Sequence, residues 1–198
     1  MKNRKGFTIV ELMIAIVIFT IGFLSAYLLI YSAINSSARS KNEIIASNIA
    51  REQIELVKNI RDTNWLKNWD WNDLTEILGT GNLGDSTYYV IENDYSGAVP
   101  IKMAELNPPF DGTKGKVLGN LNVRLCSDSQ GRYSHCVSGE VKTNFYSFIK
   151  VEPLVTKNTI TNSDVPVVGA FRIESVVVNN EKGYNEFKIN TIITDWKR

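Results

Sequence analysis

The sequence has little of what catalysis and metal binding require. Its 198 residues include one histidine, His135, and only two cysteines. No P-loop, dinucleotide-binding glycine pattern, HExxH or Ser/His/Asp set is recognisable in it. The formal net charge is +1, so charge alone indicates no nucleic-acid or anionic-lipid surface. We therefore expect no catalysis, no cofactor and no metal site, with His135 at the surface.

The two cysteines, Cys126 and Cys136, are separated by nine residues. A metal site would need more ligands than His135 can add, whereas a cysteine pair outside the cytoplasm is typical of a disulfide. Turn residues 128–131 lie between the cysteines, and a hairpin centred on Gly131 would place the cysteines opposite one another at its base. Cys126 shares a strand face with Arg124, which predicts a bridge outside the core.

Proline and glycine are absent from residues 23–78. This removes the usual helix breakers and predicts a long helix. Its first part is the run 7–31, whose 25 residues contain one residue that is charged at neutral pH, Glu11. About 20 apolar helical residues cross the roughly 30 Å of a bilayer core. With the basic residues of segment 1–6 on the cytoplasmic side, we predict one transmembrane segment.

Glu11 distinguishes between the possible interpretations of this apolar run. A secretory signal peptide would have an apolar core of about 7–15 residues, which is shorter than the run observed. A signal anchor explains the length and the basic flank, but a carboxylate at that depth costs about 2.5–3.5 kcal/mol without a partner. Cleavage after Gly6 would create a partner, because it frees an α-amine on Phe7, four residues before Glu11.

The residues Lys5-Gly6-Phe7-Thr8-Ile9-Val10-Glu11-Leu12 resemble the prepilin cleavage and methylation motif of type IV pilins and of the pseudopilins of type II secretion. The strong part of the resemblance covers residues 5–31. It implies that a prepilin peptidase cuts after Gly6 and methylates the new N-terminus, Phe7. It also implies that Glu11 pairs with the terminal amine of a neighbouring subunit as a filament assembles.

Beyond residue 31 the expected helix becomes amphipathic. Apolar residues alternate spacings of four and seven, which is close to the helical period: Ile34, Ala38, Ile45, Ile49, Leu56 and Ile60. The polar residues Asn42, Glu52 and Gln53 lie on or beside this stripe. We predict one helix from about Thr8 to Asp62, ended at Asn64, that presents the stripe to a globular domain.

From residue 79 onward short β-rich runs alternate with turn residues. Strands are expected at residues 87–91, 118–126, 144–151, 169–178 and 186–195. In the last run, Phe187, Ile189 and Ile193 share one face while Lys188 and Asn190 share the other, which predicts an antiparallel sheet with one buried side. Residues 179–185 should join the last two strands, and 95–115 should form a surface loop.

These elements predict an α+β fold, with a long N-terminal helix packed on a C-terminal antiparallel β-sheet domain, as in pilins. The expected parts are a leader peptide 1–6, a transmembrane and assembly helix 7–31, an amphipathic continuation 32–64 and a β-rich head 65–198. The resemblance implies a non-enzymatic structural subunit of a type IV pilus. In major pilins a disulfide often closes the C-terminal region, and here no cysteine follows Cys136. The resemblance therefore favours a minor pilin over a major one.

The implied partners are other pilin subunits, the prepilin peptidase, the inner-membrane pilus assembly machinery and, before assembly, membrane lipid. The chain would cross the inner membrane once and then enter a cell-surface filament. One alternative is a type II secretion pseudopilin. Another is a filament-tip subunit that binds DNA or a surface glycan through basic or aromatic side chains: Arg124, Arg132, Lys142, Trp65, Trp69 and Trp71.

Overall fold

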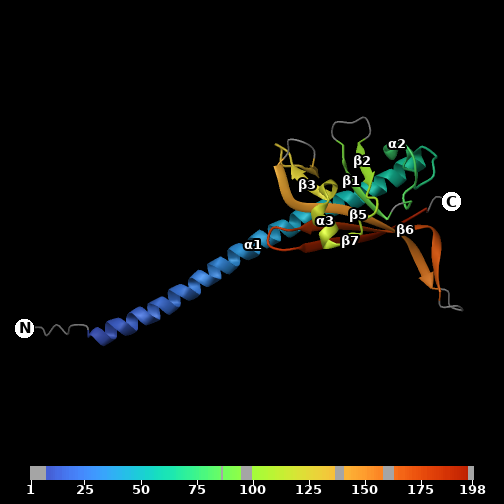
Figure 1. Ribbon diagram of the computed structural model, residues 1–198. Helices are drawn as coiled ribbons and strands as arrows, with labels where there is room; N and C mark the ends of the chain where they lie inside the picture. The colour runs from blue at the N-terminus through green and yellow to red at the C-terminus, as the bar shows by residue number, and fades with distance from the viewer. Residues whose placement is uncertain (1–7, 86, 95–99, 137–140, 158–162, 196–198) are drawn as a thin grey trace, which may run out of the picture. The chain divides into compact units, whose positions relative to one another are not determined.

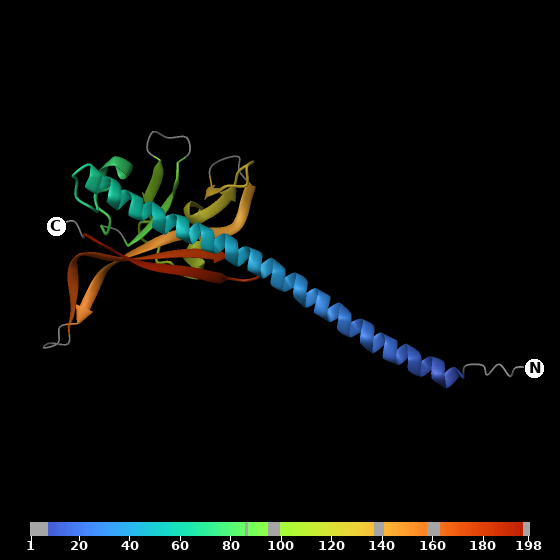
Figure 2. The same ribbon diagram turned by 180° about the vertical axis from the view of Figure 1, so that it is seen from behind.

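The computed structural model describes residues 8–85, 87–94, 100–136, 141–157 and 163–195 (Figures 1 and 2). It has two compact units, Met1–Glu43 and Ile44–Arg198. Helix α1, Ile9–Leu66, begins in the first unit and ends in the second. The remaining helices and all seven strands belong to the second unit, which we call the head. The predicted α+β layout is confirmed.

The described part of the first unit is helical from Ile9 onward, and its apolar side chains are exposed, from Ile9 to Ile34. Within the described residues, α1 is the helix that is long and apolar enough to cross a membrane, judged by length and composition. An apolar surface on all sides is typical of a helix surrounded by lipid or by other apolar helices.

Helix α1 ends at Leu66, four residues later than predicted. Asn68 adopts a positive φ of 59°, its N–H donates to the Trp65 carbonyl over 3.1 Å, and the Trp69 N–H donates to the Asn64 carbonyl over 2.9 Å. These two bonds form a Schellman motif, which commonly ends helices at a left-handed residue. The prediction that Asn64 ends the helix was therefore wrong, since that role falls to Asn68.

The head is one antiparallel sheet with short helices between its strands (Figure 1). The strands are β1 (Tyr88–Asn93), β2 (Ile101–Glu105), β3 (Arg124–Ser127), β4 (Tyr133–His135), β5 (Val141–Lys157), β6 (Asp164–Asn179) and β7 (Asn185–Thr194). The helices are α2 (Thr75–Leu78), α3 (Lys114–Gly119) and a 3₁₀ turn, Leu121–Val123.

Strand β5 connects the whole sheet, because it pairs with three other strands. Strand β6 pairs along its length on one edge, with Phe145 opposite Asn179 and Lys157 opposite Asp164. The other edge is shared: β3 pairs with β5 up to Tyr146, and β1 pairs with it from Ile149. Ser147 and Phe148 thus lie where β5 passes from one partner to the next.

Helix α1 covers one face of this sheet. Its buried residues from Ala46 to Ile60 pack against side chains of β1, β3, β5, β6 and β7, among them Ile91, Leu125, Ile149, Ile173 and Ile193. The apolar stripe is confirmed within the head, because Ile49, Leu56 and Ile60 are buried.

The second face of the sheet is also buried over β1, β5 and β6, so the prediction of one buried side holds for β7 but not for the whole sheet. Tyr146, Phe148 and Val176 pack there against Phe110 and Val117. The covering segment follows β2 and includes α3. Residues 95–115 were expected to form a surface loop, but 95–99 lie outside the described residues, 101–105 form β2, and Leu106 and Phe110 are buried.

Most of the predicted strands are confirmed, with longer bounds for β5 and β6. In β7, Phe187, Ile189 and Ile193 face inward as predicted, and the connection after Asn179 joins β6 to β7. The strand predicted at 118–126 begins only at Arg124 because α3 and the 3₁₀ turn precede it. Strands β2 and β4 were missed, since five- and three-residue strands carry too little alternation to be recognised.

Neighbouring isoleucines on β7 test the assignment of its buried face. Ile193 is fully buried whereas Ile192 is 54% exposed. We expect Ile193→Ala to lower the free energy of unfolding by about 2–5 kcal/mol, because it leaves a cavity in the core. The matched control Ile192→Ala should change it by about 0.5 kcal/mol or less. Chemical denaturation of the full-length protein in detergent measures both, and equal effects would contradict the assigned face.

Candidate functional site

The first candidate site is the start of α1. Gly6 and Phe7 lie outside the described residues, and the description begins at Thr8. The Glu11 N–H donates to the Thr8 Oγ1 over 3.3 Å, and the Leu12 N–H donates to the Thr8 carbonyl over 3.2 Å. Thr8 is therefore the N-cap, which places Glu11 at the third helical position.

Thr8 and Glu11 match the capping-box pattern, in which a threonine is followed by a glutamate three residues later. A carboxylate in the first turn is stabilised by the positive end of the helix dipole. Sequence analysis predicted the helix start near Thr8 but missed its capping role, although the T-x-x-E spacing was present to be recognised. Glu11 is exposed and has no ion pair among the described residues, so its carboxylate can meet a group from another molecule.

The second candidate site is the β3–β4 hairpin, which Cys126 and Cys136 join as a disulfide with an S–S distance of 2.11 Å and a Cα–Cα distance of 4.8 Å. In the strand register Cys126 lies opposite Ser134, so the cysteines are diagonal neighbours and not directly opposite as predicted. Cys126 is buried, which also corrects the prediction of a bridge outside the core. The reason is that β3 has neighbours on both edges and the sheet is covered on both faces.

The turn of this hairpin is built around Asp128. Gly131 adopts a φ of 77°, as the predicted turn requires, and its N–H donates to the Asp128 carbonyl over 3.1 Å. The Asp128 carboxylate accepts hydrogen bonds from the backbone N–H groups of Gln130 and Arg132 and from the Arg132 guanidinium. These bonds, chiefly those from Arg132, hold the pKa of Asp128 below its ordinary value.

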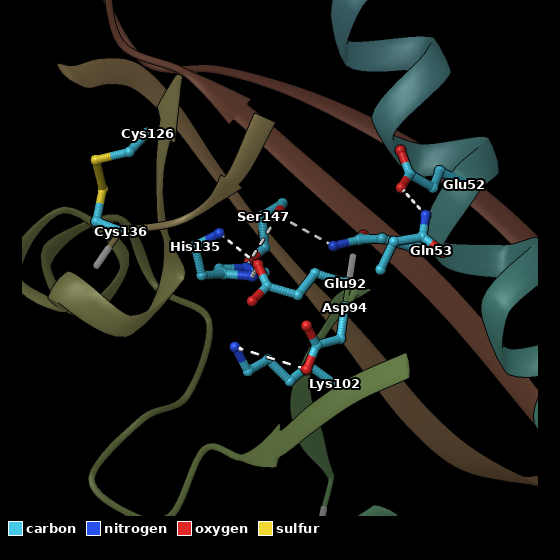
Figure 3. Close-up of polar contacts among 10 residues, drawn as sticks. Glu52, Gln53, Glu92, Asp94, Lys102, Cys126, His135, Cys136 and Ser147 are labelled. Atoms are coloured by element: carbon cyan, nitrogen blue, oxygen red, sulfur yellow. Dashed lines mark hydrogen bonds and ion pairs between the residues drawn. A yellow bond between two sulfur atoms is a disulfide. The ribbon is translucent and has the colours of Figure 1, made fainter. Parts of the chain in front are cut away.

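A buried polar cluster lies beside the hairpin, between the sheet and α1 (Figure 3). His135 is only 9% exposed, so the prediction of a surface histidine was wrong. Its backbone N–H and ring Nδ1 lie 2.5 and 3.0 Å from Glu92 Oε2, and its ring Nε2 lies 3.1 Å from the Ser147 carbonyl oxygen. Gln53 of α1 donates to the Ser147 hydroxyl over 3.0 Å and accepts from the Ser175 hydroxyl over 2.7 Å.

Ser147, His135 and Glu92 follow one another in the order of nucleophile, base and carboxylate found in serine hydrolases, with 3.3 Å between the Ser147 Oγ and His135 Nε2. Sequence analysis recognised no such set, because its members are scattered over β1, β4 and β5. A nucleophile has to reach the carbonyl of a substrate. Ser147 is fully buried and its hydroxyl already binds Gln53, so this arrangement holds the fold together and offers no route to a substrate.

The side chains considered for binding DNA or a glycan are mostly engaged within the head. Arg124 Nε donates to the Thr143 carbonyl over 3.0 Å, and Arg132 pairs with Asp128. Trp65 is buried, and Trp71 packs against Phe171 with their ring centroids 5.3 Å apart. Lys142 and Trp69 remain exposed. The three tryptophans therefore do not present one aromatic platform.

Comparison with known proteins adds one match. The family description of the prokaryotic N-terminal methylation motif matches residues 1–27. No curated protein and no solved structure matches the chain. The match covers the cleavage motif and most of the apolar run, and it supports a type IV pilin-like or pseudopilin subunit. The match does not extend to the head.

The disulfide gives the head a measurable share of its stability. Closing a loop of about 11 residues stabilises a fold by about 3 kcal/mol in the chain-entropy model. We therefore expect replacement of Cys126 and Cys136 together by alanine to lower the free energy of unfolding by about that amount, measured by chemical denaturation. The matched control is the Ser127→Ala and Ser134→Ala pair on the same two strands, which keeps the bridge. Free thiols in the unreduced exported protein, detected by alkylation and mass spectrometry, would contradict the bridge.

Proposed function

We propose that this protein is a structural subunit of a type IV pilus-like filament, processed by a prepilin peptidase and assembled through its N-terminal helix. The observation that carries the proposal is the methylation motif matched over residues 1–27, a range that includes the start of a helix with exposed apolar side chains from Ile9 to Ile34. The long helix and the antiparallel head agree with the architecture that the motif implies.

Processing is proposed at Gly6, with Phe7 as the methylated N-terminus of the mature protein. This position for the cut is compatible with the start of α1, because Thr8 caps the helix and the bond between Gly6 and Phe7 precedes Thr8 in the chain. The mature N-terminal amine would then lie within one helical turn of Glu11 in sequence.

Assembly is proposed to depend on Glu11. In lipid, a carboxylate in the apolar run is costly unless it has a partner. A terminal amine from a neighbouring subunit provides one, and the pair would then be removed from lipid together as subunits pack. The same pairing would favour one axial offset between neighbouring subunits, because at any other offset the Glu11 carboxylate and the terminal amine would both stay unpaired.

The location follows from these steps. The chain would cross the inner membrane once, with its head outside the cytoplasm, and would then enter a filament at the cell surface. The disulfide fits an oxidising compartment. We favour a minor pilin because the bridge joins a hairpin in the middle of the chain, leaving the C-terminal region without one. A type II secretion pseudopilin shares all of these features, and antibody-labelled long surface fibres would distinguish the pilus from it.

Mass spectrometry of the membrane-extracted protein tests processing. We expect a mature chain that begins at N-methylated Phe7. Gly6→Leu should block cleavage and leave the full-length chain, because the bulky side chain occupies the position next to the cut bond. Gly22→Leu is the matched control, since a side chain at Gly22 meets open space in the described structure, and it should be cleaved normally. A wild-type chain that keeps residues 1–6 would refute prepilin processing.

Substitution of Glu11 tests assembly separately. Glu11→Ala should be cleaved and methylated like the wild type, while its incorporation into filaments falls by at least about tenfold, because the amine loses its partner. Immunoblotting of sheared filaments against membrane fractions measures the distribution. Glu43→Ala removes a glutamate from the exposed pair with Arg39 on the same helix and should assemble normally. Normal assembly of Glu11→Ala would show that the amine pairing is wrong.

A further inference from the structure

The sheet of the head has a break along one edge of β5. Tyr146 is the last residue that pairs with β3, and Ile149 is the first that pairs with β1. Between them, Ser147 and Phe148 have no strand beside them on that edge among the described residues. Such a break leaves buried backbone groups that need partners from elsewhere.

His135 closes this break. It is the last residue of β4, which pairs only with β3 among the described strands. Its ring Nε2 contacts the Ser147 carbonyl, and its backbone N–H and ring Nδ1 both contact the Glu92 carboxylate of β1 (Figure 3). One residue therefore joins β4, β5 and β1 where no strand pairing joins them.

The groups around the ring are of two kinds. The Ser147 carbonyl oxygen and an ionised Glu92 carboxylate are both hydrogen-bond acceptors, whereas the Ser147 hydroxyl, 3.3 Å from ring Nε2, can donate or accept. Ring Nε2 therefore has a partner with or without a proton, and ring Nδ1 has the Glu92 carboxylate as its acceptor. A buried carboxylate is strongly destabilising when its partner is lost.

Other charged groups surround Glu92 on each neighbouring element. Lys102 of β2 lies opposite it in the strand register and also pairs with Asp94, with 4.0 Å between Lys102 Nζ and Asp94 Oδ2. On α1, the Glu52 carboxylate accepts a hydrogen bond from the side chain of Asn93, the residue that follows Glu92. Burial by itself raises the pKa of Glu92, but the hydrogen bonds and charge of His135, with the charge of Lys102, lower it overall.

We propose that the Glu92–His135 contact is an acid-sensitive latch that holds strand β4 and the β3–β4 hairpin closed beside α1. The hairpin and α1 enclose a groove of about 240 Å³ lined by Ile45, Asn48, Ile49, Glu52, Arg132 and Tyr133. When the Glu92–His135 contact is lost, β4 and the turn before it, with Arg132 and Tyr133, are free to move away from α1. The Cys126–Cys136 bridge keeps the end of β4 attached to β3. The proposal concerns the head alone and holds whatever filament the protein forms.

The direction of the pH response follows from the lowered pKa of Glu92. The ionised carboxylate stabilises the closed hairpin at any pH above the ordinary glutamate pKa, near 4.5. As the pH falls through the lowered value, Glu92 takes up a proton and its carboxyl group becomes a weaker acceptor for the two N–H groups of His135. The latch therefore opens in acid and stays closed at neutral pH.

The chain contains one histidine, so selective ¹⁵N-histidine labelling of the full-length protein in detergent gives a single backbone amide signal, that of His135. This amide is itself the donor to Glu92. We expect its protection from hydrogen exchange, corrected for the intrinsic rate, to fall by at least about tenfold between pH 6.5 and pH 3, since the amide loses a hydrogen bond to a charged acceptor. Far-UV circular dichroism, recorded in parallel, should remain that of the folded head over this range.

Two amide substitutions complete the test. Glu92→Gln should lose protection at His135 at pH 6.5 and show little further change in acid. Asp94→Asn is the matched control, because the side chains of Asp94 and Glu92 are 16% and 17% exposed and only Glu92 contacts His135; it should keep the wild-type profile. Three results would each overturn the latch: protection that persists at pH 3 in the folded wild type, unfolding of the head before protection falls, or equal effects of the two substitutions. If Glu92→Gln does not fold, the wild-type pH series decides.

Discussion

The head depends on the burial of one stripe of α1 against β5 and β6. The stripe contains Gln53, whose amide would be costly to bury among apolar side chains alone. The two serines opposite it, Ser147 on β5 and Ser175 on β6, are fully buried and satisfy both ends of that amide. Because these bonds form at only one offset of helix and sheet, Gln53 positions α1 along the strands as well as stabilising it. The apolar residues around Gln53 supply most of the free energy of packing, and the Gln53 amide determines the offset of α1 along the strands.

Strand β5 links the position of α1 to the other strands of the head. It is 17 residues long and is the only described strand that pairs with β1, β3 and β6. The two short strands on its other edge, β1 and β3, leave Ser147 and Phe148 unpaired between them, and the His135 ring contacts the Ser147 carbonyl there. The contact of His135 with Glu92 and Ser147, which fills the break in the sheet, is also the contact that we propose to respond to acid.

Helix α1 has two parts with different surroundings. In the head its buried face is narrow and, apart from exposed Ile44 and Leu66, most of the remaining side chains are polar, as expected for a helix in water with one packed side. In residues 9–34 apolar side chains are exposed in every direction, which water would not favour. One continuous helix can serve both because its backbone hydrogen bonds are internal in either solvent. This continuity is what lets a membrane segment become the packing element of a proposed filament without refolding.

The sequence by itself determined the features that depend on neighbours along the chain. The lack of breakers predicted α1, alternation predicted β7, and a single pair of cysteines left one bridge to form, because each pattern reports on a few consecutive residues. Only the tertiary structure decided that His135 and Cys126 are buried, that residues 106–119 cover the second face of the sheet, and that Gln53 meets Ser147, 94 residues away. Those outcomes depend on which distant segments pack together. A histidine or a glutamine has the same local pattern at a surface as in a core, so its role is set by the partners that folding brings to it.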